Sequence, residues 1–326
     1  MKRILSFAVA LAATATAMAQ NIAVVSPNNT TKIYQTLDEA ITNAASGSVI
    51  YIPGGGFQVT DNAKIDKQLT IMGVSHRGDT DNADGATIIS GNLNFASGSS
   101  RSAVIGVFVS GNVNITDSVA NFTMRYCNVN SVQVNNSKSM GMVINQCYLR
   151  NNSNLGNCNV TLENNILHSA HHINGGKVNH NVIVSNSWYH YTNWNYCLAD
   201  VNSTTISYNF ILDGGGHFHE GSNCTVLNNC RGIGSWGDNP VILPEGTKWE
   251  DVFKAHKGVS IVSDYHLTDT WAKSTAPDLS KVGIYGGGTG FSDKALAPIP
   301  RIVSKEVAEQ TDGSGKLEIK VTVKAQ

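Results

Sequence analysis

The chain has 326 residues and a formal net charge of −1, and only 14% of its residues are charged. This balance argues against nucleic acid as a partner, because binding phosphates requires a basic face. It also gives no electrostatic reason to expect a polyanion or a membrane surface as a ligand. The length fits one large domain or two smaller ones.

Residues 1–19 have the three parts of a secretory signal peptide. Lys2 and Arg3 supply the positive charge, a short apolar run follows, and Ala17 and Ala19 form a small-residue cleavage motif. The apolar run is too short to span a bilayer, and no later segment is long and apolar enough to do so. We therefore expect cleavage near Ala19, no membrane insertion and an extracytoplasmic location, whether periplasmic, cell-surface or secreted.

The first predicted element of the mature chain is an amphipathic helix over residues 36–44. Its apolar residues recur at helical spacing and form one face, which is suited to covering the open end of a β-structure. Such a cover is needed because an uncovered first strand leaves a free edge. The residues of this face are Leu37, Ala40, Ile41 and Ala44.

Residues 20–239 contain a six-residue pattern with an apolar first position and Asn or Cys at the fourth. All 35 Asn of the chain lie in this range. The pattern recurs at spacings of 20, 18, 16, 28 and 20 residues. Its fourth positions are Cys127, Cys147, Asn165, Asn181, Asn209 and Asn229.

A repeat near 20 residues suits a solenoid in which each turn is built from short strands. Turns stack at the inter-strand distance of about 4.8 Å, so equivalent residues form files. We predict that the first position fills the interior and that the fourth lies at a bend, where Asn side chains form a ladder. A β-sandwich is the rival fold, but it offers no stack of equivalent bends.

Six Cys in an exported chain could form three disulfides. Cys127 and Cys147 occupy the ladder position, so we interpret them as packed thiols. Cys224 and Cys230 are close enough in sequence for a bridge, and that pairing stays open.

The chain resembles the pectate lyase-like superfamily of right-handed parallel β-helices over roughly residues 32–235. The resemblance is carried by the helix at 36–44, by GSVIYIPGG at 47–55 and by IDKQLTIMG at 65–73. It implies an all-β, single-stranded right-handed parallel β-helix over residues 20–239 with an N-terminal capping helix. It implies no particular activity, because the superfamily includes lyases, hydrolases, esterases, epimerases and adhesins.

Residues 240–326 contain no Asn and hold 22 charged residues, against 23 in the longer range 20–239. We expect a small C-terminal capping region with a helix near 249–254. The region resembles the ends of exported β-helix proteins of gut Bacteroidales that have no assigned activity. A one-face-buried strand is predicted at 316–323, with a sorting signal as the competing interpretation. Its alternating apolar residues are Leu317, Ile319, Val321 and Val323.

An insertion between the Asn181 and Asn209 repeats is the first candidate site. It holds five aromatic residues in ten, and loops on a rigid scaffold are where function concentrates. Aromatic rings can stack on sugar faces, so we predict that it binds polysaccharide or a cell-surface glycan. The alternative is a satellite core in which the rings pack on the scaffold. The candidate residues are Trp188, Tyr189, His190, Tyr191, Trp194 and Tyr196.

Seven of the ten His lie between His168 and His219. His217 and His219 are two residues apart and point the same way on a strand, and Glu220 follows them. This group is a candidate transition-metal site or general base, and an ordinary polar loop is the alternative.

Arg125 and Glu163 share the second position of the pattern two turns apart, about 10 Å from each other. They are the candidate pair for a polysaccharide lyase. The carboxylate pair of glycoside hydrolases and the oxygen ligands of a calcium-dependent lyase are not found as motifs. We therefore expect no cofactor, with calcium or a transition metal as alternatives. The predicted function is an exported protein that binds glycan or a cell-envelope ligand; a polysaccharide lyase or glycoside hydrolase and a structural adhesin are the alternatives.

Overall fold

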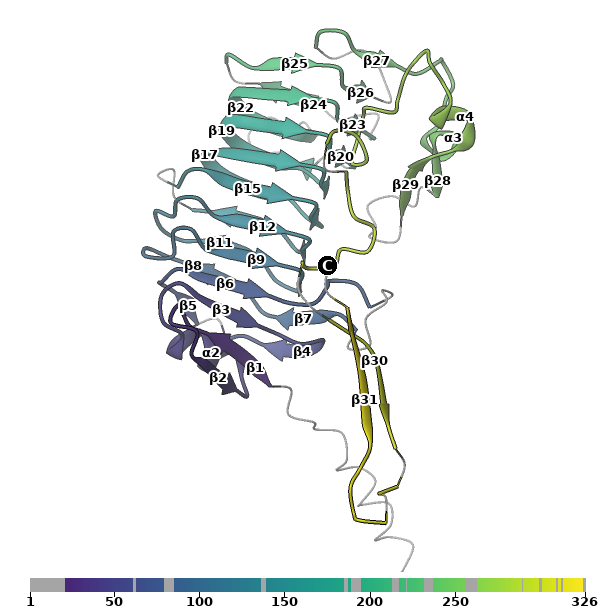
Figure 1. The fold of residues 1–326 in the computed structure, drawn as a ribbon. Helices are drawn as coiled ribbons and strands as arrows, with labels where there is room; N and C mark the ends of the chain where they lie inside the picture. Colours follow the sequence, from purple (N-terminus) through teal and green to yellow (C-terminus); the bar gives the residue numbers. More distant parts are fainter. Residues whose placement is uncertain are drawn as a thin grey trace, which may run out of the picture.

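The computed structural model describes most of the chain after residue 20. The described residues are 21–60, 63–78, 85–135, 139–184, 187–188, 195–212, 217–220, 222–231, 237–255, 263–288, 290–298, 301–308, 310–311 and 313–324. The predicted signal peptide therefore lies outside the described residues. What is described is mostly β-strand, arranged in parallel sheets whose strands stack in one direction (Figure 1).

In the larger sheet the parallel pairings form two ladders, which merge part-way along the chain into one sheet of 17 strands. In chain order they are β1 (Ile22–Val25), β2 (Thr31–Tyr34), β3 (Ser48–Tyr51), β5 (Lys64–Ile65), β6 (Leu69–Met72), β8 (Leu93–Phe95), β9 (Ala103–Ile105), β11 (Val113–Ile115), β12 (Thr123–Arg125), β14 (Val132–Val134), β15 (Met142–Asn145), β17 (Ser153–Glu163), β19 (Ala170–Asn179), β21 (Ser187–Trp188), β22 (Asn195–Ser207), β24 (His217–Glu220) and β25 (Thr225–Leu227).

The second sheet has ten short strands, each paired in parallel with the strand one turn later. They are β4 (Gly55–Gln58), β7 (Thr87–Ser90), β10 (Phe108–Val109), β13 (Asn128–Val129), β16 (Tyr148–Leu149), β18 (Ile166–Leu167), β20 (Val182–Ile183), β23 (Phe210–Ile211), β26 (Cys230–Arg231) and β27 (Val241–Ile242).

The registers confirm that equivalent positions of the six-residue pattern lie directly over one another. Met124 pairs with Ile144, Ile144 with Leu162, and the file continues one residue per turn. The side chains of this file point inward, so the predicted apolar first position does fill the core. Its members, at most 9% exposed, are Met124, Ile144, Leu162, Val178, Ile206 and Val226.

The predicted Asn ladder is present at the bend between the two sheets. The Oδ1 atom of Asn181 accepts from the backbone N–H of Asn165 at 2.9 Å and from its Nδ2 at 3.1 Å. Asn181 in turn donates its backbone N–H and its Nδ2 to Oδ1 of Asn209, both at 2.9 Å. Asn209 repeats both bonds with Asn229 at 2.9 Å. Because these amides are at most 1% exposed, each bond replaces one that water no longer provides.

Cys127 and Cys147 occupy the ladder positions of the two preceding turns, and both are fully buried and free. The thiol of Cys147 donates to the carbonyl of Asn145 at 3.3 Å, and its backbone N–H donates to Oδ1 of Asn165 at 2.8 Å. Burial raises the pKa of this thiol well above its ordinary value. The prediction of packed thiols is confirmed. Cys224 and Cys230 are also free, so the open question of a bridge between them is answered in the negative.

The N-terminal helix is confirmed as α2 (Leu37–Asn43), and all four residues of its predicted apolar face are buried. Thr36 caps the helix by accepting the backbone N–H of Glu39 at 3.2 Å. The sequence did not predict that β1 pairs antiparallel with both β2 and β3. This antiparallel pair covers the edge of the first strand of the parallel stack.

The C-terminal region was expected to cap the end of the stack. It lies along the side of the stack instead. Its elements are α3 (Trp249–Val252), β28 (Phe253–Ala255), β29 (Asp264–Leu267) and α4 (Asp269–Ala272), so the helix expected at 249–254 ends earlier and continues as a strand. Phe210 of β23 meets the ring of Phe253 edge-on, at 5.1 Å between centroids. The apolar cluster on this outer face of the second sheet includes Tyr148, Ile166, Val182, Phe253, Tyr265 and Leu279.

Residues 279–288 and 290–297, which we term the strap, run along the bends back toward the start of the stack. Gly283 donates its N–H to the carbonyl of Tyr208 at 2.7 Å. Asn164 donates its side-chain amide to the carbonyl of Ile284 at 2.8 Å, and Ser292 donates its N–H to the side-chain oxygen of Gln146 at 2.7 Å. The strap therefore bridges several successive turns.

The last two strands, β30 (Arg301–Val307) and β31 (Ile319–Lys324), form an antiparallel hairpin. The strand predicted at 316–323 is confirmed, but the prediction that one face is buried is wrong. Its four alternating apolar side chains are 46–58% exposed. In Figure 1 the hairpin extends as an arm past the N-terminal end of the stack. No helix in the described part of the chain has the length and apolar character needed to cross a bilayer.

Replacing Asn181 with Ala should destabilise the stack by about 2–4 kcal/mol, because the buried N–H of Asn165 and the carbonyl of Leu162 lose their partners. Asn174→Ala is the matched control, since Asn174 is exposed on the neighbouring strand β19 and should change stability by less than about 0.5 kcal/mol. Chemical unfolding followed by circular dichroism measures both. Equal losses in the two variants would contradict a stabilising ladder.

Candidate functional site

Three segments that are separate in sequence meet at one edge of the larger sheet, which is formed by the N-terminal ends of adjacent strands. They are the start of β19, the start of β22 that follows the aromatic insertion, and the strand β24. Ala170 pairs with Leu198, and Leu198 pairs with Phe218. One residue further along, Ala199 lies between His171 and His219 in the same file. The insertion and the His-rich segments therefore share one edge of the scaffold.

The insertion begins and ends as a short antiparallel hairpin in an otherwise parallel part of the sheet. Ser187 pairs with Tyr196, and Trp188 pairs with Asn195. Backbone pairing thus places Trp188 and Tyr196 at the base of the insertion, with Tyr196 beside His217 of β24. The other four predicted ligand-binding residues, Tyr189, His190, Tyr191 and Trp194, lie outside the described residues.

The predicted catalytic or metal group His217, His219 and Glu220 lies on β24, as a strand. Its backbone pairs with that of β22, so the two His are placed beside Tyr196 and Ala199. Among the described residues, no group of three or more His, Cys, Asp or Glu is arranged to hold a metal ion. A metal at these three residues stays a prediction.

His171 is the most perturbed histidine at this edge. It is 8% exposed, and burial lowers its pKa to about 4, helped by the neighbouring His172 and His168 and opposed by Asp200. Burial also lowers the pKa of His168, whose Nδ1 atom is enclosed with no hydrogen-bond partner among the described residues. Both imidazoles are therefore neutral at pH 7, and a neutral imidazole can exchange hydrogen bonds with a hydroxyl group.

His172 and Asp200 form the polar contact nearest to this pair. Nδ1 of His172 lies 3.5 Å from Oδ2 of Asp200, and both residues have positive φ, 57° and 51°. They are stacked bend residues of successive turns. The sequence shows that this segment is rich in His. It does not reveal Asp200 as a partner, because 28 residues separate His172 from Asp200 and only the register brings them together.

Arg125 and Glu163 lie in one outward-facing file, as predicted. Asn145 occupies the position between them and donates its side-chain amide to the backbone carbonyl of Glu163 at 3.1 Å. The backbones of Arg125 and Glu163 are two strand spacings apart, about 10 Å. The file is continued by Asn179 and Ser207, whose side chains are hydrogen-bonded at 2.9 Å. The arrangement is an outer polar ladder with one charge of each sign.

A second group of titratable residues lies in the C-terminal region and carries no sequence motif. Nδ1 of His266 lies 2.7 Å from Oδ1 of Asp264, its Nε2 lies 3.6 Å from Oδ2 of Asp293, and its ring stacks on Tyr285 at 3.9 Å. Burial acts to raise the pKa of Asp264, but the hydrogen bonds and charge of His266 outweigh it and lower the pKa. These side chains are 41–55% exposed, so the group ties the strap to β29 at the surface.

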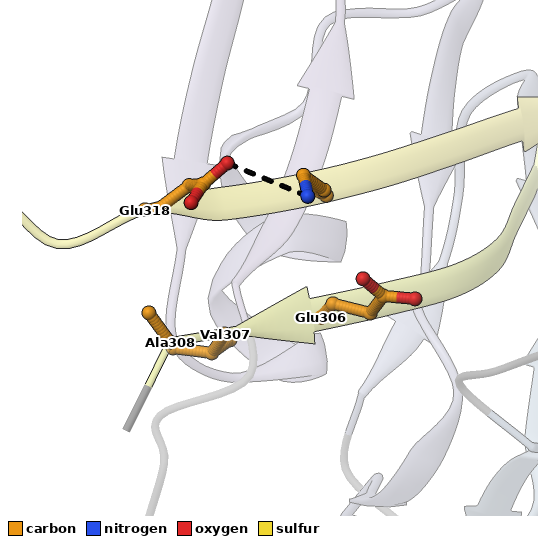
Figure 2. A pocket seen from close by; sticks show the side chains of 5 residues that line it. Glu306, Val307, Ala308 and Glu318 are labelled. Atoms are coloured by element: carbon orange, nitrogen blue, oxygen red, sulfur yellow. Dashed lines mark ion pairs between the residues drawn. The ribbon is translucent and has the colours of Figure 1, made fainter. Parts of the chain in front are cut away.

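A shallow pocket lies on the β30–β31 hairpin. Figure 2 shows its lining, where Glu306, Val307 and Ala308 come from one strand and Glu318 and Lys320 from the other. Nζ of Lys320 lies 3.5 Å from Oε1 of Glu318, and both side chains are about 70% exposed. Such an exposed pair contributes little to stability and supplies no catalytic group.

Comparison with protein-family models, with curated proteins and with solved structures finds none that matches this chain.

Acid should destabilise the protein through His171. The pKa of this imidazole is about 4 in the folded state and about 6.5 when unfolded, so between these values the unfolded state binds more protons. Stability present above pH 6.5 should fall by up to roughly 3 kcal/mol as the pH drops to 4. His171→Asn should flatten this dependence, measured as melting temperature against pH. Asn174→Ala, an exposed control with no titratable group, should leave it unchanged; an unaltered slope in His171→Asn would refute the assignment.

Proposed function

We propose that the two parallel sheets are faces of a single right-handed parallel β-helix. The support is the strand order, in which each short strand pairs with its equivalent one turn later, together with the unbroken ladder at the bends. The chain passes from one sheet to the other and back in each turn. This architecture supplies a long, rigid wall to which the base of the aromatic insertion is paired.

The function of this wall is to present the insertion at residues 187–196 to a glycan or another cell-envelope ligand outside the cytoplasm. The observation that carries the proposal is the pairing of Trp188 with Asn195, which anchors the base of the aromatic insertion on the scaffold. The neighbouring strands bring His171 and His219 to the same edge. Aromatic surface beside neutral polar groups suits a ligand rich in hydroxyl groups and poor in charge.

The low charge of the chain and its N-terminal segment agree with this role. A signal peptide over residues 1–19 would deliver the protein to the compartment where polysaccharides and cell-surface glycans are found. Buried free thiols are compatible with export, because burial disfavours the thiolate, which is the reactive form.

Polysaccharide cleavage is the second candidate, and the observation that favours it is the position of His217, His219 and Glu220 on β24, beside β22. An imidazole or a carboxylate can act as a general base toward a sugar or water. Release of unsaturated or reducing ends from a broad panel of polysaccharides would establish the activity. Release of neither, together with retained glycan binding, would leave the protein as a binder.

Replacing Trp188 and Trp194 with Ala should weaken glycan binding about ten-fold or more for each ring, because truncating a central aromatic anchor typically costs above 1.4 kcal/mol. The melting temperature should stay unchanged, because in this proposal the rings contact the ligand and not the scaffold. Glycan arrays followed by titration calorimetry measure the effect. Tyr51→Ala, on a strand several turns away, is the matched control and should bind as the wild type does.

Loss of melting temperature in the Trp variants would show instead that the rings pack on the scaffold. Binding of a protein partner with no response to any free sugar would favour an adhesin over a glycan binder.

A further inference from the structure

The β30–β31 hairpin holds five of the nine large apolar side chains that are exposed in the described residues. Val307 on β30 is 54% exposed, and Ile319, Val321 and Val323 on β31 are 58%, 50% and 56% exposed. In the described residues this sheet contains only the two strands. A two-stranded hairpin by itself is marginally stable in water, and an uncovered apolar face makes it a surface for association.

Both strands of the hairpin are also edge strands. β31 pairs with β30 on one side, and the backbone N–H and C=O groups on its other side form a template for a further strand. The charges of β31 indicate which strand can pair there.

β31 is complementary to itself in antiparallel order. When two copies are placed with Val321 opposite Val321, Ile319 lies opposite Val323, and the apolar faces coincide. In the same register Glu318 of each copy lies opposite Lys324 of the other. Opposite charges and apolar pairs facing each other directly across two strands are both favourable.

The neighbouring registers are unfavourable. A shift by one residue places apolar side chains opposite polar ones on the wrong face. A shift by two residues centres the pair on Lys320 or on Thr322. The first places Lys320 opposite Lys320, and the second places Lys320 opposite Lys324, so both set like charges against each other. Among these registers, only the one centred on Val321 joins unlike charges while it keeps the apolar faces together.

We propose that β31 is a homodimerisation strand, through which two copies of this chain join their hairpins into one four-stranded antiparallel sheet. The contact has a two-fold axis at Val321 and is isologous, so the same residues act on both sides and the assembly closes at two copies. The arm-like position of the hairpin in Figure 1 leaves β31 accessible beside the stack. Figure 2 shows Glu318, one of the two charged residues of the contact, at the start of this strand.

Charge variants of the full chain test the register. By sedimentation velocity and light scattering the wild type should be a dimer. Lys324→Glu places Glu opposite Glu at both ends of the contact and should raise the dimer dissociation constant about ten-fold. Glu318→Lys should do the same, and the double variant Glu318→Lys with Lys324→Glu should restore wild-type affinity. A monomeric wild type, or a double variant as weak as the singles, would overturn the proposal.

A cysteine cross-link tests the axis independently. In the proposed contact Val321 lies opposite itself with its Cα atoms about 4.5–5.5 Å apart, a distance that a disulfide spans. Val321→Cys should therefore give a covalent dimer on non-reducing gels after treatment with oxidised glutathione. Lys320→Cys is the control, because its nearest copy lies diagonally at more than about 7 Å. Equal cross-linking of both variants, or of neither, would show that the strands are not paired as proposed. An unchanged melting temperature of the stack shows that each variant is folded.

Discussion

The structure depends on the hydrogen bonding of asparagine side chains at one bend of each turn. Each amide accepts from the backbone of the preceding turn and donates to a carbonyl in the core, as Asn181 does toward Asn165 and Leu162. An unpaired buried amide costs several times what a paired one contributes, so the file is stable only when its members are in register. This interaction therefore sets the vertical alignment of the turns.

The ladder also accounts for the backbone just before it. The residue preceding each ladder position has a positive φ, between 53° and 57°, and none of the six is Gly. A non-glycine residue in this region costs on the order of 1 kcal/mol or more and persists only where the surroundings enforce it. At four of the six positions the following ladder Asn supplies that enforcement, whereas Cys127 or Cys147 follows the other two. The strap adds hydrogen bonds to some of the same residues. The six residues with positive φ are Tyr126, Gln146, Asn164, His180, Tyr208 and Asn228.

Features that repeat along the chain could be predicted, because their physical cause is local and recurs. The inward file, the ladder with its two thiols and the helix at 36–44 all follow from periodic patterns. The antiparallel cover of β1 on β3 has no periodicity, and neither has the docking of Phe253 on the side of the stack. The contact of His172 with Asp200 required the register across an insertion, and the cluster around His266 joins β29 to residues of the strap that are distant in sequence. Exposure of β31 could not be predicted either, because alternation shows that a strand has an apolar face but not what covers it.

Asn181 and Asn209 are 28 residues apart in sequence, whereas Asn165 and Asn181 are 16 apart, yet both pairs have the same 2.9 Å backbone-to-amide bond. The geometry of the ladder therefore does not depend on the number of residues between two successive ladder positions. The segment between two ladder residues can therefore change in length or sequence without changing the geometry of the stack. Such a molecule separates the part whose length can vary from the part whose geometry is fixed. The segment between Asn181 and Asn209 is where a foreign peptide could be grafted with the least disturbance to folding.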